Sequence, residues 1–120
     1  MMNLITMGDA AGIGSEILIK AWAQEPQAVQ TSCVAGDWLV MQRAHAVCQQ
    51  TGLPVPTLRL VDSLEQASQA AQAGLLPVLQ ACQPSAQLPD FGQTSAEAGR
   101  MAAECIVYAT NAVLRKQAKA

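Results

Sequence analysis

Short apolar runs alternate with amphipathic stretches along the chain, and this alternation constrains the fold more than any other feature. Four of these runs are rich in apolar and β-branched residues: NLITM at 3–7, TSCVA at 31–35, TLRLV at 57–61 and LLPVLQ at 75–80. Apolar runs of this length, separated by helical segments, are typical of parallel β-α-β units. We therefore expect the order β-α-β-α-β-α-β-loop-α, with a mostly parallel sheet flanked by helices.

The first helical segment follows the first run and a glycine-rich loop. Ile17, Leu18, Ala21 and Trp22 recur at a spacing that places them on one helix face, and Pro26 should end this helix. The second segment begins after Asp37, a good N-cap, and Gly52 with Pro54 should end it. Its expected apolar stripe comprises Val40, Met41, Ala44, Val47 and Cys48.

Capping-box patterns predict the starts of the last two helices. One spans 63–66, and the helix that it opens should stop at Gly74. The other begins at Thr94 and opens the longest helix, over 95–115, after a loop at 81–93. The run at 75–80 is a weaker strand, because Pro77 cannot donate to a ladder and should lie at an edge or a bulge.

The loop in ITMGDAAGIGSEI, residues 5–17, joins a predicted strand to a predicted helix. Glycines let a ligand approach the backbone, and a helix N-terminus suits an anion. Gly8-x-x-x-Gly12-x-Gly14 is nevertheless neither a dinucleotide fingerprint nor a P-loop. The pattern is compatible with two alternatives, a ligand-binding loop and a purely structural βα turn. Asp37 is likewise either a ribose-binding acid or the next N-cap.

Composition excludes several classes of protein. The chain has 120 residues, a net charge of −2 and 3% aromatic residues, which argues against a nucleic-acid surface. We expect no membrane span, since no apolar run reaches about 18 residues. The cysteines lack metal-site spacing, so buried thiols in a cytoplasmic protein are expected. Three cations near the C-terminus suggest a solvated helix end, with a binding patch as the alternative: Arg115, Lys116 and Lys119.

The loop sequence resembles the N-terminal signature I-T-M-G-D-P-A-G-I-G-P-E of the 4-hydroxythreonine-4-phosphate dehydrogenase family. Two weaker segments follow in the family order: CVAGD at 33–37, and Gly92 with TSAEAG at 94–99. The resemblance implies a three-layer α/β fold like that of isocitrate and isopropylmalate dehydrogenases. The chain, residues 1–120, would be the N-terminal part of such a domain, and therefore incomplete.

The same resemblance implies an activity and its requirements. The family oxidises a small phosphorylated hydroxy acid with NAD or NADP, and the β-keto product loses carbon dioxide. A divalent metal, Zn or Mg, holds the substrate, and the enzyme is a cytoplasmic homodimer. Carried over, Gly12, Ile13 and Gly14 would line the cofactor pocket, with Gly8 and Asp9 shaping the loop.

This chain departs from the family pattern at several points. Ala10 and Ser15 stand where the family has proline, so we expect a less preorganised loop in which the Ser15 hydroxyl serves as an N-cap. The metal ligands of the family are three histidines, whereas this chain has only His45, expected to be a surface or hydrogen-bonded side chain. No catalytic or metal-binding residue is therefore predicted here.

Three hypotheses about function follow. The first is a truncated portion of the dehydrogenase that is inactive alone. The second is a non-catalytic nucleotide- or phosphate-binding module. The third is an interaction module, because the apolar face of the helix at 95–115 predicts self-association or a partner. We favour the first hypothesis on the strength of the loop signature.

Overall fold

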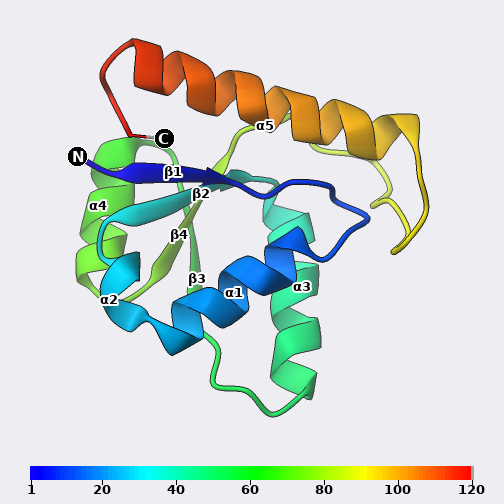
Figure 1. Cartoon of the computed structure of the whole chain (residues 1–120), viewed down its shortest axis with the longest axis horizontal. Coiled ribbons are helices and arrows are strands. Elements are labelled where there is room, and N and C mark those ends of the chain that lie inside the picture. Colours follow the sequence, from blue (N-terminus) through cyan, green and yellow to red (C-terminus); the bar gives the residue numbers. More distant parts are fainter. Residues whose placement is uncertain (120) are drawn as a thin grey trace.

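The computed structural model describes residues 1–119, which form a four-stranded parallel sheet (Figure 1). The strands lie in the order β1-β2-β4-β3, and every neighbouring pair is parallel. Their bounds are β1 Asn3–Thr6, β2 Ser32–Gly36, β3 Leu58–Val61 and β4 Leu76–Gln80. The predicted strands and their parallel pairing are thus confirmed.

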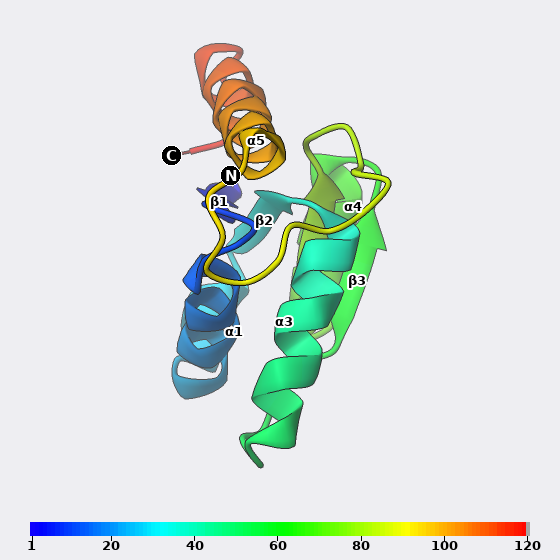
Figure 2. The same cartoon turned by 90° about the vertical axis from the view of Figure 1, so that its right-hand side faces the viewer.

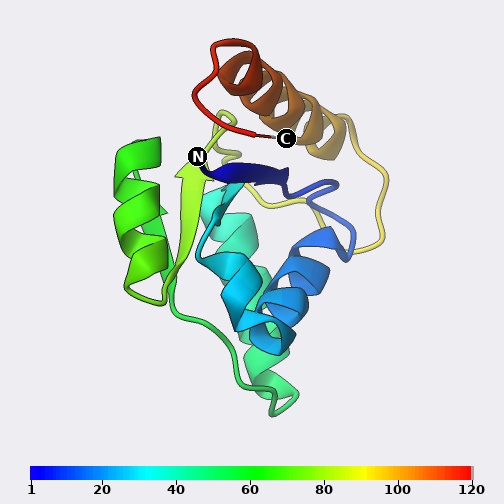
Figure 3. The same cartoon turned by 60° about the vertical axis from the view of Figure 1, so that its left-hand side comes forward.

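Helices cover both faces of the sheet. Their bounds are α1 Gly14–Gln24, α2 Pro26–Val29, α3 Trp38–Gln50, α4 Leu64–Gln72 and α5 Ala96–Leu114. Helices α1 and α3 pack together on one face, whereas α4 contacts β2 and β4, and α5 contacts β1 and β2, on the other (Figure 3). Right-handed crossovers explain this division, because the chain first moves from β1 toward β3 and then returns through β4. The predicted three-layer fold is confirmed.

The core consists mainly of small and sulfur-containing side chains. The largest fully buried ones include Met7, Ile19, Met41 and Met101. Alanines fill much of the remaining interior, as expected from a chain with 3% aromatic residues. All four cysteines are free and buried, as the composition predicted.

Side-chain caps begin three of the helices. The carboxylate of Asp37 accepts a hydrogen bond from the Val40 amide at 3.0 Å, which confirms the predicted N-cap of α3. Ser63 caps α4 in the same way. The predicted cap of α5 is wrong by one residue, because Ser95 rather than Thr94 accepts the amide bond. Tandem hydroxyl residues offer two possible caps, and only backbone geometry selects one.

Strand β4 corrects the expectation that Pro77 would lie at a sheet edge or bulge. It is a central strand, between β2 and β3. The Leu76 amide faces β3, where it donates to Thr57, and the Ala81 amide donates to Gly36 of β2. Since amides alternate sides, the missing Pro77 donor would face β2. The ladder with β2 begins only at Val78, so no bond is lost.

The buried face of α1 also differs from the prediction. Ile17 is 54% exposed, whereas Ile19 is fully buried and Ser15 is 3% exposed. Leu18 and Trp22 complete the packed face. The buried stripe therefore comprises positions 15, 18, 19 and 22, and it begins with a polar residue that apolar periodicity does not reveal.

None of the helices in residues 1–119 is long and apolar enough to cross a membrane.

Candidate functional site at the carboxyl edge of the sheet

The glycine loop lies where β1 ends and α1 begins, at the carboxyl edge of the parallel sheet. Asp9 organises it from within: its side chain accepts a hydrogen bond from the Ala11 amide at 2.9 Å, and its carbonyl accepts one from the Gly12 amide at 3.0 Å. Ala10 and Ala11 are buried, whereas Asp9 is exposed. The loop is thus a packed turn with one exposed rim.

The physical reason for glycine differs among the three glycine positions of the loop. Gly8 has φ +79°, a left-handed conformation that favours glycine. A Cβ on Gly14 would lie 2.7 Å from the carbonyl oxygen of Met7. A Cβ on Gly12 would meet nothing closer than 3.5 Å, which is ordinary contact. The fold therefore requires glycine at positions 8 and 14 but not at 12.

The start of α1 carries no side-chain cap. Ile13 occupies the N-cap position, makes no side-chain hydrogen bond and is 65% exposed. The expectation that Ser15 serves as the N-cap is wrong. Ser15 lies inside the helix, and its buried Oγ has no partner among the described residues. The backbone amides of the first turn therefore adjoin the exposed rim formed by Ile13.

Arg43 of α3 joins the glycine loop to the loop between β4 and α5. Its guanidinium donates to the carbonyl of Ala10 and to the carbonyl of Pro89, both at 2.7 Å, and lies 4.0 Å from the centroid of the Phe91 ring. The Gly92 amide donates to Ala11 at 2.7 Å. Figure 2 shows the loop after β4 passing along this edge near the start of α1. The role of Arg43 could not be predicted from the sequence, because nothing local links it to its partners, which lie 33 and 46 positions away.

A second polar cluster lies where β2 and β4 end. The helices that follow these two neighbouring strands, α3 and α5, cover opposite faces of the sheet. The carboxyl ends of such a strand pair form a topological switch point, where α/β sheets commonly bind ligands. Here the Gln80 side chain donates to Asp37 at 2.7 Å and accepts from the Trp38 amide at 2.8 Å. Asp37 is 1% exposed, so it acts as a cap and tether rather than as an accessible ribose-binding acid.

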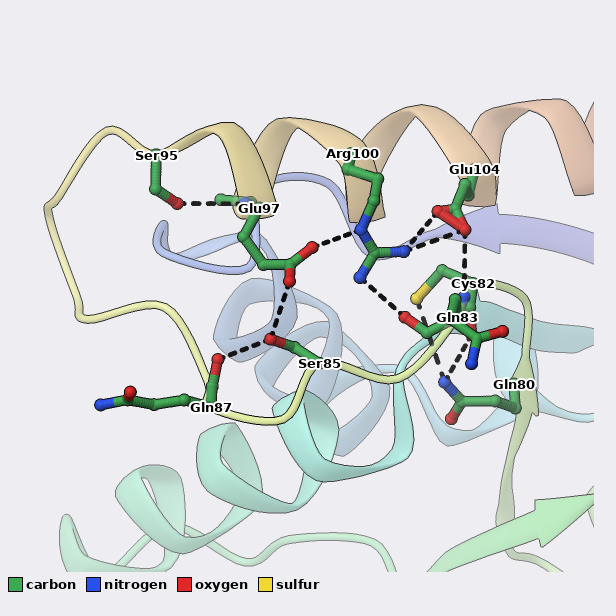
Figure 4. Close-up of polar contacts among 10 residues, drawn as sticks. Gln80, Cys82, Gln83, Ser85, Gln87, Ser95, Glu97, Arg100 and Glu104 are labelled. Atoms are coloured by element: carbon green, nitrogen blue, oxygen red, sulfur yellow. Dashed lines mark hydrogen bonds and ion pairs between the residues drawn. The ribbon is translucent and has the colours of Figure 1, made fainter.

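An ion-pair cluster fixes the other end of the loop after β4 (Figure 4). Arg100 pairs with Glu97 and Glu104 on α5 and donates to the Gln83 carbonyl at 2.9 Å. Ser85 donates to Glu97 at 3.2 Å. These bonds hold the first part of the loop against α5, while Arg43 holds its second part against the glycine loop. Glu97 and Glu104 are therefore both paired with Arg100.

The described residues show no metal centre. Across residues 1–119, no three or more His, Cys, Asp and Glu side chains lie close enough to hold an ion. The Nε2 atom of His45 is 2.7 Å from the Pro56 carbonyl, which confirms a hydrogen-bonded histidine.

The buried thiols are not poised for chemistry either. Burial raises the pKa of the Cys33 thiol to about 12, and burial together with Cys82 raises the pKa of Cys105 to about 12. Such thiols are poor nucleophiles.

Comparison with known proteins supports the likeness that the loop suggested. No protein-family model matches the chain. It is 38% identical over 105 residues to 4-hydroxythreonine-4-phosphate dehydrogenase of Beijerinckia indica, covering 88% of this chain and 29% of that protein. It is 31% identical over 117 residues to D-threonate 4-phosphate dehydrogenase of Salmonella typhimurium, and the alignment covers 97% of this chain and 34% of that protein.

Solved structures agree with the sequence matches. The crystal structure of 4-hydroxythreonine-4-phosphate dehydrogenase from Klebsiella pneumoniae aligns with a TM-score of 0.76 at 28% identity. The enzyme of that name from Burkholderia phymatum gives the same values, and in both alignments 98% of this chain covers 34% of the other. This chain matches one segment of the proteins of the 4-hydroxythreonine-4-phosphate dehydrogenase family. The resemblance stated from the loop is confirmed, and the chain spans about one third of the length of these relatives.

Proposed function

We propose that the chain is part of an NAD- or NADP-dependent dehydrogenase for a phosphorylated hydroxy acid such as 4-hydroxythreonine 4-phosphate. In this proposal the glycine loop lines the cofactor pocket through Gly12, Ile13 and Gly14, with Gly8 and Asp9 shaping it. The bound nicotinamide would accept the hydride. The residues of this chain would bind and orient the cofactor, and the oxidised product would then lose carbon dioxide.

One observation carries the proposal: the fold has room for a side chain at position 12, yet the residue there is glycine. Gly8 and Gly14 are explained by backbone conformation and by the Met7 carbonyl. Gly12 is followed by the exposed Ile13 and by the uncapped amides of α1. A ligand approaching this rim would meet backbone donors and a positive helix end, which suits a phosphate group of a dinucleotide.

The divalent metal of the family does not fit the described residues. No cluster of suitable ligands exists in residues 1–119, so a Zn or Mg site would lie on a part of the enzyme outside them. We therefore expect the chain alone to bind cofactor but not to turn over substrate. We also propose a homodimeric, cytoplasmic enzyme.

Nucleotide titration tests the proposal directly. We expect NAD, NADP or AMP to shift the amide resonances of residues 12–15 at millimolar concentration, and Gly12→Ala to weaken binding at least tenfold. Absence of shifts in the wild-type chain would contradict a cofactor pocket. Shifts without any dehydrogenase activity, even after the chain is joined to the remainder of a relative, would favour the non-catalytic binding module.

Turnover is a separate measurement. The 120-residue chain, given 4-hydroxythreonine 4-phosphate, NAD and Zn or Mg, should form no NADH above background. Substrate-dependent NADH formation would show that the catalytic groups are complete in this chain, contrary to the proposal.

A further inference from the structure

Phe91 is held at the tip of a turn that is bonded to the glycine loop. The Gln93 amide donates to the Asp90 carbonyl at 3.3 Å and closes the turn, and Gly92 within it has φ +75°. The Gly92 amide also donates to the Ala11 carbonyl at 2.7 Å. Small and polar residues dominate such turns, so an aromatic residue at this position needs a physical reason.

Packing accounts for only one side of the Phe91 ring. The guanidinium of Arg43 lies over the ring, 4.0 Å from its centroid, in a cation–π contact. The same guanidinium donates to the Ala10 carbonyl at 2.7 Å, which ties the ring to the glycine loop. Phe91 nevertheless stays 46% exposed. The ring is therefore fixed in position while much of its surface is available for a further contact.

This ring lies at the carboxyl edge of the sheet, close to the proposed cofactor loop. The residue bonded to its turn, Ala11, is two positions before Ile13, the uncapped N-cap of α1. Figure 2 shows the loop after β4 passing beside the start of α1. The Lys119 bridge is instead at Asn3, the opposite end of β1. The ring therefore belongs to the edge at which α/β sheets bind ligands.

A nucleotide bound at this edge would bring an aromatic ring toward Phe91. In the proposed function a phosphate of the cofactor lies at the free amides of the first turn of α1. A ribose joins that phosphate to the base, so the base extends from the first turn over the adjoining residues. Aromatic side chains stack on bases because both present flat π faces. The exposed part of the Phe91 ring is suited to this contact.

The charge of Arg43 distinguishes between the two rings of the cofactor. Arg43 forms no ion pair within residues 1–119, since its side chain contacts two carbonyls and the ring. A guanidinium on one face of an aromatic ring favours a neutral, electron-rich ring on the other face. Adenine meets this requirement. The oxidised nicotinamide ring is a cation, and stacking it there would place two positive charges across one ring.

We propose that Phe91 binds the adenine ring of the nucleotide by stacking, while Arg43 holds the ring of Phe91 from the other side. This inference rests on the proposed function, because it places the adenosine half of the same cofactor. The alternative is that Phe91 serves only to anchor its loop to Arg43, in which case the base of the ligand is irrelevant to binding.

Three ligands that share a ribose 5-phosphate group separate the base from the phosphate. They are AMP, oxidised nicotinamide mononucleotide and ribose 5-phosphate itself. We would measure their affinities from the amide shifts of residues 12–15 in the wild-type chain and in three variants. Phe91→Tyr keeps an aromatic ring and Phe91→Leu removes it. Tyr108→Leu is the matched control, because Tyr108 is 37% exposed but lies on α5.

We expect AMP to bind at least about fivefold more tightly than the other two ligands in the wild-type chain, Phe91→Tyr and Tyr108→Leu. In Phe91→Leu the advantage of AMP over ribose 5-phosphate should fall below about twofold, while ribose 5-phosphate binds as before. Nuclear Overhauser effects between the adenine and Phe91 ring protons are expected in the wild-type chain. This second measurement needs no variant to fold.

The outcomes separate this inference from the proposed function. Equal affinities for AMP and ribose 5-phosphate, with shifts at residues 12–15, would overturn the stacking and leave the phosphate site standing. Nicotinamide mononucleotide binding as tightly as AMP, an undiminished preference for AMP in Phe91→Leu, or the absence of the Overhauser effects would do the same. No response of the wild-type chain to any of the three ligands would contradict the proposed function, and the stacking with it.

Discussion

Gly12 and Gly14 look alike in the sequence but have different roles in the structure. A Cβ at Gly14 would overlap the Met7 carbonyl at 2.7 Å, whereas a Cβ at Gly12 has room. The two glycines therefore separate the requirements of folding from those of binding. Sequence alone could not make this distinction, because the Met7 carbonyl reaches Gly14 only through the shape of the turn.

We predict that Gly14→Ala destabilises the chain by about 1–3 kcal/mol, since backbone must shift to admit the methyl group. Gly12→Ala should change the unfolding free energy by no more than about 1 kcal/mol, and replacing glycine here can even stabilise. Urea unfolding of both variants measures the difference. Equal destabilisation would show that Gly12, too, is required by the fold.

Arg43 holds two loops with one side chain. Arg43→Met should lower the unfolding free energy by about 1–3 kcal/mol, because two charged hydrogen bonds and a ring contact are lost. It should also speed hydrogen exchange at the Gly92 amide, which bonds to Ala11. Arg59→Met, at an exposed position on β3, is the control and should do neither. Unchanged Gly92 exchange in Arg43→Met would contradict the clamp.

At the scale of elements, the loop between β4 and α5 is fixed at both ends although it has no regular structure. Arg100 and its partners hold residues 83–85, and Arg43 holds residues 89–92. The capping pattern predicted the start of α5 to within one residue, because caps are local. The contacts across the loop could not be predicted, because they join segments that only the fold brings together.

The ion pairs at this loop predict a dependence of stability on pH. The hydrogen bond from Arg100, aided by Ser85, holds the pKa of Glu97 below its usual value of 4.5. The unfolded chain therefore takes up the proton first as the pH falls. The stabilisation is present above pH 4.5 and is lost as the pH falls below it.

Glu97→Gln should therefore lose less stability than the wild-type chain between pH 5 and pH 3. Glu65→Gln is a matched control, since Glu65 also lies in the first turn of its helix and is exposed. Chemical unfolding at several pH values gives the comparison. Parallel pH profiles for the wild-type chain and Glu97→Gln would argue against the pairing.

At the scale of the whole molecule, the four cysteines are distributed through one core. Burial raises the pKa of Cys33 and Cys105 to about 12, and it also raises the pKa of Cys48 and Cys82. We predict that a thiol reagent at pH 8 reacts at least a hundredfold more slowly with the native chain than with the chain in urea. Rapid labelling of any thiol in the native state would show that the core opens locally.

The sequence by itself determined the class of fold, the approximate positions of the strands and longer helices, and the family that the glycine loop resembles. These depend on local periodicity, on caps and on a short signature, and each is contained within a few adjacent residues. Only the tertiary structure decided that β4 is central, that Ser15 is buried and that Arg43 joins two loops. Each of these depends on strand order and on contacts between distant segments, which local pattern does not encode.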